Sequence, residues 1–529
     1  PSPPMLDQVM VRSALARDRA RYVGEAVAVV LATSAVAAAD AVEVVVLEVE
    51  PLPAVVGFDA ARCDDVLLHP DAGTNRCYSM GGEPAPDLFD GCEVVVELTF
   101  ANPRLNGAPI EPRGAVAQWR EEDGCLRLTQ WSCTQFPHRA RDSLAAGCGV
   151  ETGDVRVITP EVGGGFGAKN GSYPEDIVVA LAARATGRPV CWIETRSESM
   201  LNLAHGRGLE LTATLGGDSD GTLAAYRLHI DQDAGAHPGI GAFLPVFGQM
   251  MATGSYDIPK LEFSAESWVT TTVPMGAYRG AGRPEATHGI ERIMDRYAVE
   301  IGMDPAELRR RNFIDPEVFP FTTPSGQVYD SGAYADALDA VLDALGIEDL
   351  RADQDRRRGD DECSLLGIGF AAYVEIANPT RAPEFGSVTI RPDGSAVVLT
   401  GSSAHGQSHH TTFAQVAADV LGIDFDLIEV RHGDTDEVVR GGGTGGSRSL
   451  QTGGVAVHRA SEAVVEDAKR VVAGLLEASA DDVVLDVDSG VFSVAGSPTV
   501  HVGWVDVAAE AARIGEQLAE EVDFQPSEA

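Results

Sequence analysis

Four glycine-rich segments, far apart along the chain, contain the residues whose types are best suited to chemistry. They combine glycines with hydrogen-bonding or charged side chains, at residues 134–138 with 162–169, 277–284, 405–411 and 441–449. Because glycine has no Cβ, such a backbone can bring its N–H groups close to anionic oxygens. The last three segments each precede a predicted helix, and helix N-termini attract phosphates. Any one segment could be only a tight turn, but several converging segments would suit a ligand with a diphosphate.

The run 162–169, V-G-G-G-F-G-A-K, holds one of only three lysines, Lys169, Lys260 and Lys469. A lysine in a glycine loop suggests nucleotide hydrolysis, but the chain lacks the G-x-x-x-x-G-K-[ST] pattern of a P-loop. The segment Gly280-Ala281-Gly282 also lacks the preceding strand and the later carboxylate of a Rossmann site. Phosphoryl transfer and nicotinamide binding are therefore both disfavoured.

Histidines and cysteines do not form a recognisable metal site. His405, His409 and His410 lie at a predicted loop–helix junction, where their spacing is poor for a closed site and no carboxylate or thiolate completes it. The eight cysteines contain no C-x-x-C pair, so neither a zinc ribbon nor an iron–sulfur cluster is expected. We expect most of them to be reduced and buried in a cytoplasmic protein.

Length and charge limit the class of protein. At 529 residues the chain can form two to four domains, on the usual basis of about 150 residues per domain. Its formal net charge of −40 argues against nucleic acid or an anionic membrane surface as the main partner, since both would repel it. The most apolar stretch, 26–39, is too short and too interrupted to span a membrane.

The hydrophobic pattern predicts helices and strands in alternation, which is typical of an α+β protein. Residues 20–56 are predicted to form a strand, a helix and a second strand, with the strands at 27–30 and 44–49. A helix is expected at 174–186, where Pro174 begins it and Gly187 ends it. The next prediction is a hairpin that pairs 209–215 with 222–230.

Four further helices, a hairpin and a charged segment are predicted in the rest of the chain. The helix expected at 286–301 has Ile290, Ile293, Met294, Ala298 and Ile301 on one stripe, and this stripe is interpreted as core. Residues 351–361 contain almost no apolar residue, so we expect an exposed linker there between two large parts of the chain. In the second part a hairpin is expected at 388–400, and helices at 413–421, 455–477 and 505–520.

Taken together, these motifs resemble the molybdenum-binding large subunit of the xanthine dehydrogenase and aldehyde oxidase family, which includes carbon monoxide dehydrogenase large subunits. The resemblance covers nearly the whole chain, in an ordered series of motifs. They are RYVGEAVA at 21–28, APIEPR at 108–113, TQ at 134–135, the glycine loop, PVCWIETRSE at 189–198, AYRGAGRP at 277–284, GDTD at 433–436 and GSR at 446–448.

The resemblance implies a fold and a division into domains. The fold class would be α+β, with the C-terminal part of an α/β hammerhead domain followed by two large α+β molybdopterin-binding domains. The remnant of the hammerhead would span 1–60, the first molybdopterin-binding domain 61–350, and the second, incomplete at its C-terminus, 351–529.

The resemblance also implies a molybdopterin cofactor with molybdenum, in its cytosine dinucleotide form, and a role for each matching residue. The catalytic positions would be Gln135, beside a molybdenum oxygen, Phe166 and Arg279. The cofactor would be bound by Gly165, Phe166, Gly167, Ala277, Tyr278, Arg279, Gly280, Gly406, Gln407, Thr411, Thr444, Gly446, Ser447, Arg448 and Ser449. No residue would bind the metal directly, because the pterin's own sulfurs would hold it, and the protein would supply oriented donors.

The family reaction is hydroxylation of an aldehyde or an electron-poor aromatic carbon, with water as the oxygen source and a glutamate as base. The implied partners are an iron–sulfur small subunit with [2Fe–2S] clusters, an FAD-binding medium subunit and a C-terminal portion of the large subunit, assembled as a dimer of heteromers. The remaining partner would be a small organic substrate, with no nucleic acid and no membrane.

Three departures from the family pattern narrow the expected substrates and the expected source of the catalytic base. Copper-containing carbon monoxide dehydrogenases have a cysteine where this chain has Gly280, so oxidation of carbon monoxide is disfavoured. Purine-hydroxylating members tend to have a glutamate where this chain has Asn170. Gly515-Glu516 looks like the family's catalytic Gly-Glu motif, but it falls in the helix predicted at 505–520 and is interpreted as a chance match. We therefore expect the base to come from sequence outside this chain, which would be either split or a fragment missing both ends.

Two other functions remain open. The chain could be a non-catalytic subunit that holds molybdopterin or assists assembly, or a scaffold that has lost the cofactor. The scaffold is disfavoured because Gln135, Phe166 and Arg279 are all in place.

Overall fold

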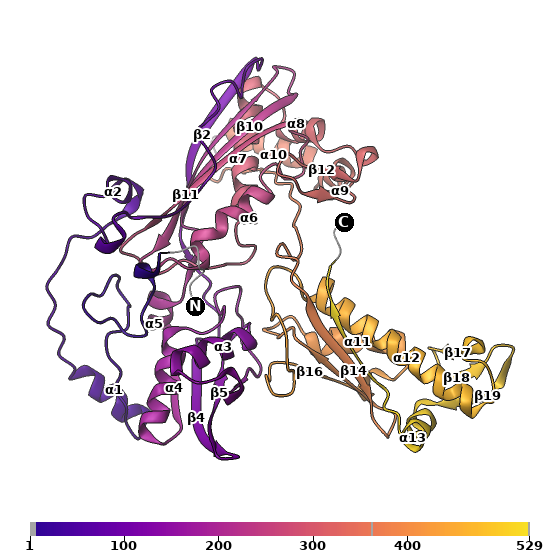
Figure 1. Ribbon diagram of the computed structural model, residues 1–529. Coiled ribbons are helices and arrows are strands. Elements are labelled where there is room, and N and C mark those ends of the chain that lie inside the picture. Colours follow the sequence, from indigo (N-terminus) through magenta and orange to yellow (C-terminus); the bar gives the residue numbers. More distant parts are fainter. Residues whose placement is uncertain (1–6, 361–362, 527–529) are drawn as a thin grey trace.

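A computed structural model describes residues 7–360 and 363–526 (Figure 1). Helices and strands mix throughout, which agrees with the predicted α+β class. We call residues 57–360 the first half and residues 363–526 the second half. The two lie side by side in Figure 1, indigo to red and orange to yellow respectively. They are in contact where Gln135 bonds Thr444.

The strand–helix–strand unit predicted for 20–56 forms only in part. Helix α1 (Ala35–Glu43) is present, capped by Ser34. Residues 27–30 and 44–49 were predicted as strands, but neither pairs with a strand in any sheet of the described residues. An extended segment needs a neighbouring strand for its N–H and C=O groups. Without such a neighbour these segments stay irregular, and the prediction of two strands is wrong for this structure.

A five-stranded sheet forms the upper part of the first half (Figure 1). Its strands, in order, are β1 (Arg76–Met80), β11 (Lys260–Val269), β10 (Leu223–Gly235), β9 (Leu209–Gly217) and β2 (Val94–Asn102). The antiparallel β9–β10 pair confirms the predicted hairpin. Helix α7 (Arg283–Ile301) packs on this sheet, and four residues of its apolar stripe are fully buried, as predicted: Ile290, Ile293, Met294 and Ala298.

Three shorter helices follow α7 in the first half. Helix α8 (Pro305–Asn312) follows α7, and α9 (Tyr334–Leu345) packs against α8. The segment predicted as a linker is mostly helical, because α10 (Ile347–Gly359) runs through it. Asp353 accepts hydrogen bonds from the guanidinium groups of Arg356 and Arg357, one turn away, at 2.6 and 2.8 Å. Such pairs support a helix whose residues are all exposed or only half-buried, so the linker interpretation is corrected; residue 361 lies outside the described residues.

A four-stranded sheet forms the lower part of the first half. Its strands, in order, are β6 (Val155–Ile158), β5 (Cys125–Ser132), β4 (Gly114–Glu122) and β7 (Val190–Ile193). Helices α3 (Pro137–Cys148) and α4 (Pro174–Thr186) cover it through small residues such as Ala140 and Ala180, which are fully buried. The bounds of α4 are those predicted from its proline and glycine. Short elements follow β7: α5 (Arg196–Asn202), and β8 (His205–Gly206), which pairs with β3 (Leu105–Asn106).

The second half is built on its own sheet. Its strands, in order, are β16 (Ile428–Arg431), β15 (Ala396–Thr400), β14 (Glu384–Ile390) and β20 (Ala519–Phe524). Helices α11 (His409–Leu421) and α12 (Val455–Leu475) pack on it. A small sheet of β17 (Val483–Asp486), β18 (Val491–Val494) and β19 (Ser497–Gly503) and helix α13 (Trp504–Ile514) form its far end (Figure 1). Helix α13 ends at Ile514, before Gly515, rather than at residue 520 as predicted.

The second half docks on the first through the motif at 433–436, which extends the lower sheet beyond β6. Asp434 forms an antiparallel bridge with Ile158. The Thr435 N–H donates to the Val157 carbonyl at 3.0 Å, and the Val157 N–H donates to the Thr435 hydroxyl at 3.0 Å. The Arg156 guanidinium also donates to the Asp434 carboxylate. This segment therefore joins the two halves along one sheet edge.

Two expectations from composition can be checked here. Within the described residues, no helix has both the length and the apolar character needed to cross a membrane. All eight cysteines are free, but only Cys148 is buried, and Cys63, Cys125, Cys191 and Cys363 are exposed. The expectation that most cysteines are buried is therefore wrong, because several lie at strand and helix ends on the surface.

Candidate functional site

The glycine loop 162–169 lies between β6 and α4 and holds Phe166 in an unusual backbone conformation. Phe166 has φ +55°, a region that residues with a Cβ seldom adopt. Its carbonyl accepts the Arg279 N–H at 2.9 Å, and the Arg279 guanidinium lies over its ring, 4.8 Å from the centroid. These two contacts stabilise the strained residue and bring together two of the predicted catalytic positions.

Gln135 connects three of the predicted segments. It is 2% exposed, and its side-chain Oε1 accepts the Gly167 N–H at 2.9 Å, while Nε2 donates to the Thr444 carbonyl at 3.0 Å. The Thr444 N–H donates in turn to the backbone carbonyl of Gln135 at 3.0 Å. A Cβ on Gly165 would lie 2.5 Å from Gln135 Oε1, so only glycine fits there. The third predicted catalytic position thus joins the glycine loop to the second half.

The segment 277–283 packs against the glycine loop. A Cβ on Gly167 would lie 2.8 Å from the Ala277 carbonyl, so the two backbones approach closely. Arg207, which sequence reasoning missed, holds this segment: its guanidinium donates to the carbonyls of Tyr278 and Arg279 at 3.1 and 2.8 Å and lies over the Tyr278 ring. Its position in the A-H-G-R run at 204–207 was the only available signal.

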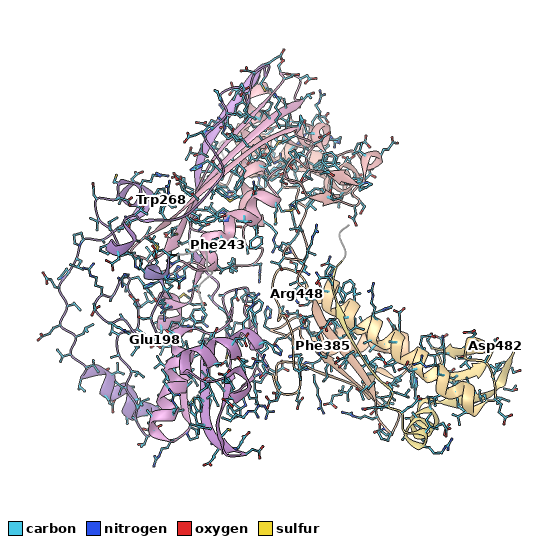
Figure 2. The ribbon with its side chains drawn as sticks, in the orientation of Figure 1. Glu198, Phe243, Trp268, Phe385, Arg448 and Asp482 are labelled. Carbon is cyan, nitrogen blue, oxygen red and sulfur yellow. The ribbon has the colours of Figure 1, made fainter. Side chains whose placement is uncertain are left out.

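The loop 441–449 brings the second half to the same place. A Cβ on Gly443 would lie 2.6 Å from the Gln135 carbonyl, so glycine allows this approach. Arg448, 5% exposed, donates through Nη2 to Glu384 at 2.8 Å, and Glu384 also accepts the Gly442 N–H at 2.9 Å. Burial raises the pKa of Glu384, although the neighbouring Arg448 opposes the shift. Figure 2 shows Arg448 on the side of the second half that faces the first.

Four other residues of this loop, Thr444, Gly446, Ser447 and Ser449, were predicted to bind a ligand. The Thr444 and Ser449 hydroxyls lie 3.0 Å apart, within hydrogen-bonding distance. The Ser447 hydroxyl donates to Glu375 at 2.5 Å. Gly446 has φ +69°, and its carbonyl accepts the Asn378 N–H at 2.8 Å, which orders the loop from the side of residues 375–378.

Gly406, Gln407 and Thr411 lie apart from Gln135, in an exposed turn and the first turn of α11. Gly406 has φ +117° and open space where a Cβ would be. The Gln407 Oε1 accepts the His405 N–H at 2.8 Å, so the turn is held by its own side chain. These predicted residues thus form an exposed edge of the site, and His410 beside them lies 3.9 Å from Glu161, just before the glycine loop.

Several buried polar atoms beside this edge have no partner among the described residues. They are Ser403 Oγ, His409 Nδ1, both ring nitrogens of His432 and Arg448 Nε. Burial lowers the pKa of His409 and of His432 to about 4, so both imidazoles are neutral at pH 7. Buried polar atoms are normally hydrogen-bonded, and His409 and His432, whose ring centroids lie 6.4 Å apart, are therefore candidates to bind a polar ligand.

A metal site is not formed by these histidines. Within the described residues, the one group with three ligand atoms in mutual reach is His229, Asp231 and Glu266. Asp231 already accepts from Arg62 and from the Trp268 indole, and Glu266 pairs with Arg76, so positive charge occupies the place of a cation.

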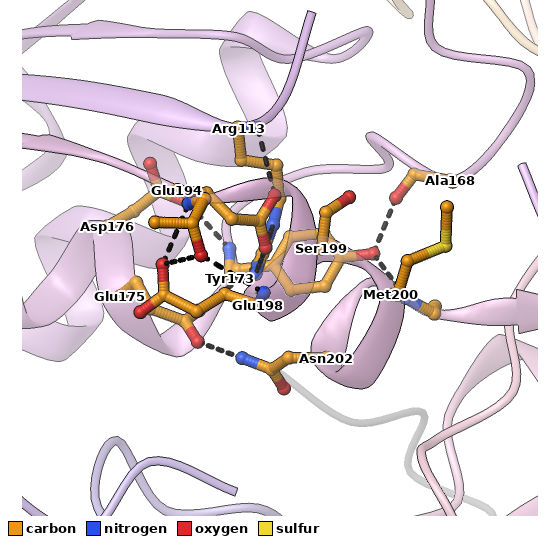
Figure 3. A network of polar contacts seen from close by, with 12 residues as sticks. Arg113, Ala168, Tyr173, Glu175, Asp176, Glu194, Glu198, Ser199, Met200 and Asn202 are labelled. Carbon is orange, nitrogen blue, oxygen red and sulfur yellow. Dashed lines mark hydrogen bonds and ion pairs between the residues drawn. The ribbon is translucent and has the colours of Figure 1, made fainter. Parts of the chain in front are cut away.

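A buried network supports the glycine loop from below (Figure 3). The Arg113 guanidinium pairs with Glu194 and Glu175 and lies 4.0 Å from the centroid of the Tyr173 ring. The Tyr173 hydroxyl donates to the Ala168 carbonyl at 2.5 Å. A cavity of about 350 Å³ lies behind this network, between residues 24–31 and α4. It is lined by Arg113 and by none of the predicted site residues, so we do not assign it to the site.

Comparisons with known proteins agree with the arrangement. Two family models described as molybdopterin cofactor-binding domains match residues 68–313 and 340–529. The chain is 35% identical to the carbon monoxide dehydrogenase large chain of Hydrogenophaga pseudoflava, over 95% of this chain and 66% of the relative. It is 34% identical to the nicotine 6-hydroxylase large subunit of Paenarthrobacter nicotinovorans, over 95% of this chain and 62% of the relative.

A solved structure also matches nearly the whole chain. Quinoline 2-oxidoreductase from Pseudomonas putida 86 superposes with a TM-score of 0.91 at 32% identity, over 97% of this chain and 68% of that one. The chain thus spans 66% and 62% of the length of the two curated relatives named above.

Proposed function

Since this chain belongs to the xanthine dehydrogenase and aldehyde oxidase family of molybdopterin-binding large subunits, we propose that it forms the molybdopterin-holding part of a hydroxylase. The substrate would be an aldehyde or an N-heteroaromatic compound, and water would supply the oxygen. The observation that carries the proposal is Gln135, a buried amide that joins the glycine loop to the second half at the junction of the two molybdopterin-binding domains.

The residues present fit such a cofactor. Its polar groups need donors and acceptors, and Ser403, His409, His432 and Arg448 offer buried atoms that have no partner in the described residues. The open backbone at Gly406 leaves room for a bulky group to approach. When bound, the molybdenum cofactor would supply two-electron oxidation and an activated oxygen from water.

The residues of the chain would orient and enclose this group. Gln135 and residues 165–167 would line the metal end, and residues 277–280 the pterin and the substrate side. The remaining proposed contacts, which would hold the pterin and a cytosine dinucleotide, are Gly406, Gln407, Thr411, Thr444, Gly446, Ser447, Arg448 and Ser449. Because Gln135 and Phe166 are fixed by the contacts described above, they would reach the reacting centre already oriented.

The base is proposed to come from a glutamate other than Glu516. Glu516 is exposed just after the end of α13, at the far end of the second half (Figure 1). The other proposed partners are a C-terminal portion of the large subunit, an iron–sulfur small subunit with [2Fe–2S] clusters and an FAD-binding medium subunit, in a dimer of heteromers.

An N-heteroaromatic compound or an aldehyde is favoured over carbon monoxide. Gly280 has φ +96°, and a Cβ there would lie 2.2 Å from Pro284 Cγ. A cysteine at this position would therefore require the loop to move, so the thiolate of a copper-containing site has no place here. The names of two similar proteins, nicotine 6-hydroxylase and quinoline 2-oxidoreductase, support the heteroaromatic class.

The test is to coexpress the chain with its three proposed partners in a host that makes the cofactor. The purified complex is analysed for molybdenum and for cytidine nucleotide, then mixed anaerobically with quinoline, nicotine or an aromatic aldehyde. Bleaching of the iron–sulfur and flavin absorbance by one of these substrates is expected. Molybdenum without any reduction would favour the non-catalytic holding subunit, and absence of molybdenum would refute the proposal.

A further inference from the structure

Glu111 contacts both ends of the glycine loop at once. Its Oε2 accepts the Gly163 N–H at 2.8 Å and pairs with the Lys169 ammonium at 2.7 Å. The Glu111 N–H also donates to the Gly163 carbonyl at 3.2 Å. One side chain outside the loop therefore joins the residue that opens it to the residue that closes it.

The pair is built into the packing. Lys169 is 1% exposed, and a Cβ on Gly163 would lie 2.5 Å from Glu111 Cβ, so the contact requires glycine at position 163, the first glycine of the loop. Cys133 donates its S–H to the second carboxylate oxygen of Glu111. Burial opposes ionisation, but the bonds from Lys169 and Gly163 keep the pKa of Glu111 below its ordinary value. The carboxylate is therefore charged at neutral pH, and its partner is the lysine.

The closed end of the loop is also connected to Gln135. The Gln135 N–H donates to the Lys169 carbonyl at 2.9 Å, and the Gln135 side chain accepts the Gly167 N–H at 2.9 Å. A shift of Lys169 would therefore move both the backbone and the side-chain contacts of Gln135. Phe166, with its left-handed backbone, lies between the Glu111 contact at Gly163 and the Gln135 contact at Gly167.

We propose that Glu111 and Lys169 are positioning residues, whose ion pair closes the neck of the glycine loop and holds Phe166 and Gly167 against Gln135. The ammonium of Lys169 is engaged in this pair and is not a phosphate ligand. The effect on the molybdenum cofactor rests on the proposed function, whereas the effect on the loop does not.

A purely stabilising ion pair would behave differently when both partners are neutralised. Removing one partner leaves a buried charge unpaired and is strongly destabilising, whereas replacing both with neutral residues of similar size is close to neutral for stability. Glu111→Gln leaves the Lys169 ammonium, 1% exposed, without its partner and should lower the melting temperature, whereas Lys169→Met leaves a carboxylate that is 33% exposed and should lower it less. The double variant should recover most of the loss seen in Glu111→Gln. The double variant still lacks the bond between the loop ends, so Phe166 and Gly167 should still not be held against Gln135.

The test measures amide hydrogen exchange of residues 163–169 in the full chain, with the melting temperature of each variant. In the double variant we expect exchange in this segment to be at least about tenfold faster than in the wild type despite the recovered melting temperature. Wild-type exchange in the double variant would overturn the proposal, because the pair would then serve stability alone. The matched control is Glu291→Gln with Arg309→Met, a buried ion pair between α7 and α8.

Molybdenum content is the second measurement. In the coexpressed complex, the Glu111→Gln/Lys169→Met variant should contain about tenfold less molybdenum per chain, while the control pair keeps the wild-type content. If the wild-type complex holds no molybdenum, the proposed function fails, and the exchange measurement still decides the role of the ion pair. Wild-type molybdenum content in the double variant would contradict the positioning role.

Discussion

At the scale of single residues, the Gln135 side chain forms hydrogen bonds to both halves of the chain. Its amide satisfies the Gly167 N–H and the Thr444 carbonyl, which lie in different halves of the chain. Gln135→Leu keeps the volume but leaves both backbone groups buried and unpaired. Each such group costs about 1–3 kcal/mol, so we expect the variant to lose about 2–6 kcal/mol of unfolding free energy, measured by urea denaturation, together with its cofactor.

The control for this substitution is Asn312→Leu. Asn312 is also buried and bonds three backbone groups, but it lies at the β9–β10 turn, in the upper part of the first half. It should lose comparable stability and keep its molybdenum. Equal molybdenum loss in both variants would mean that Gln135 acts only through stability.

His409 makes the stability of the second half sensitive to acid. Burial lowers its pKa from 6.5 to about 4, with His405 and His410 adding to the shift. Between these values the unfolded chain binds more protons than the folded chain, so unfolding free energy is complete above pH 6.5 and falls as pH approaches 4. The loss is about 3 kcal/mol at most. His409→Gln should remove that part of the pH dependence, measured by urea denaturation from pH 7 to 4.

An exposed histidine provides the comparison for His409. His501→Gln, on β19, changes the same residue type in the same half but at an exposed position. It should not remove the fall in stability that we expect His409 to cause between pH 6.5 and 4. An unchanged profile for His409→Gln would show that the buried imidazole does not stay neutral on folding.

At the scale of elements, helix α4 supports the glycine loop through its N-cap residue. The Tyr173 hydroxyl donates to the Ala168 carbonyl at 2.5 Å and accepts the Ala204 N–H at 3.3 Å. Tyr173→Phe keeps the ring beside Arg113 but leaves both backbone groups unpaired. At about 1–3 kcal/mol for each group, we expect a loss of about 2–6 kcal/mol, measured by urea denaturation, with faster amide exchange at Ala168. If stability were unchanged, water would have to replace the hydroxyl.

The sequence predicted elements well where signals were local. Pro174 and Gly187 defined both ends of α4, and the apolar stripe of α7 defined its buried face. Predictions failed where partners decide the outcome. Residues 27–30 and 44–49 have the β-branched composition of strands but no strand beside them in the described residues. Residues 351–359 lack apolar residues, yet ion pairs one turn apart favour a helix.

The site was also predictable only in part, because some of its residues depend on partners that are distant in the sequence. Glycines and polar residues marked Gln135, Phe166 and Arg279, and these lie together. Arg207 and Glu384 were missed, because their importance depends on which carbonyl or guanidinium the fold places beside them. An isolated charged residue in the sequence does not reveal its partner.

At the scale of the whole molecule, the two halves are joined along the edge of β6 as well as through Gln135. Thr435 is 3% exposed, and its hydroxyl accepts the Val157 N–H at 3.0 Å. Thr435→Val has the same shape but leaves that N–H buried and unpaired, so we expect a loss of about 1–3 kcal/mol. Because the unpaired group lies at the junction, proteolysis in the connection at 363–383 should become faster than in the wild type.

A bound cofactor should offset this loss if it bridges the halves as proposed. A ligand that binds only the folded chain adds about 4 kcal/mol when its free concentration is a thousand times its Kd, which exceeds the effect of one missing bond. Thr435→Val should therefore be cleaved faster as the apo chain but resist proteolysis in the molybdenum-loaded complex. Thr99→Val, on the exposed face of β2, is the control and should match the wild type in both states. Equal cleavage of Thr435→Val with and without molybdenum would show that the cofactor does not span the junction.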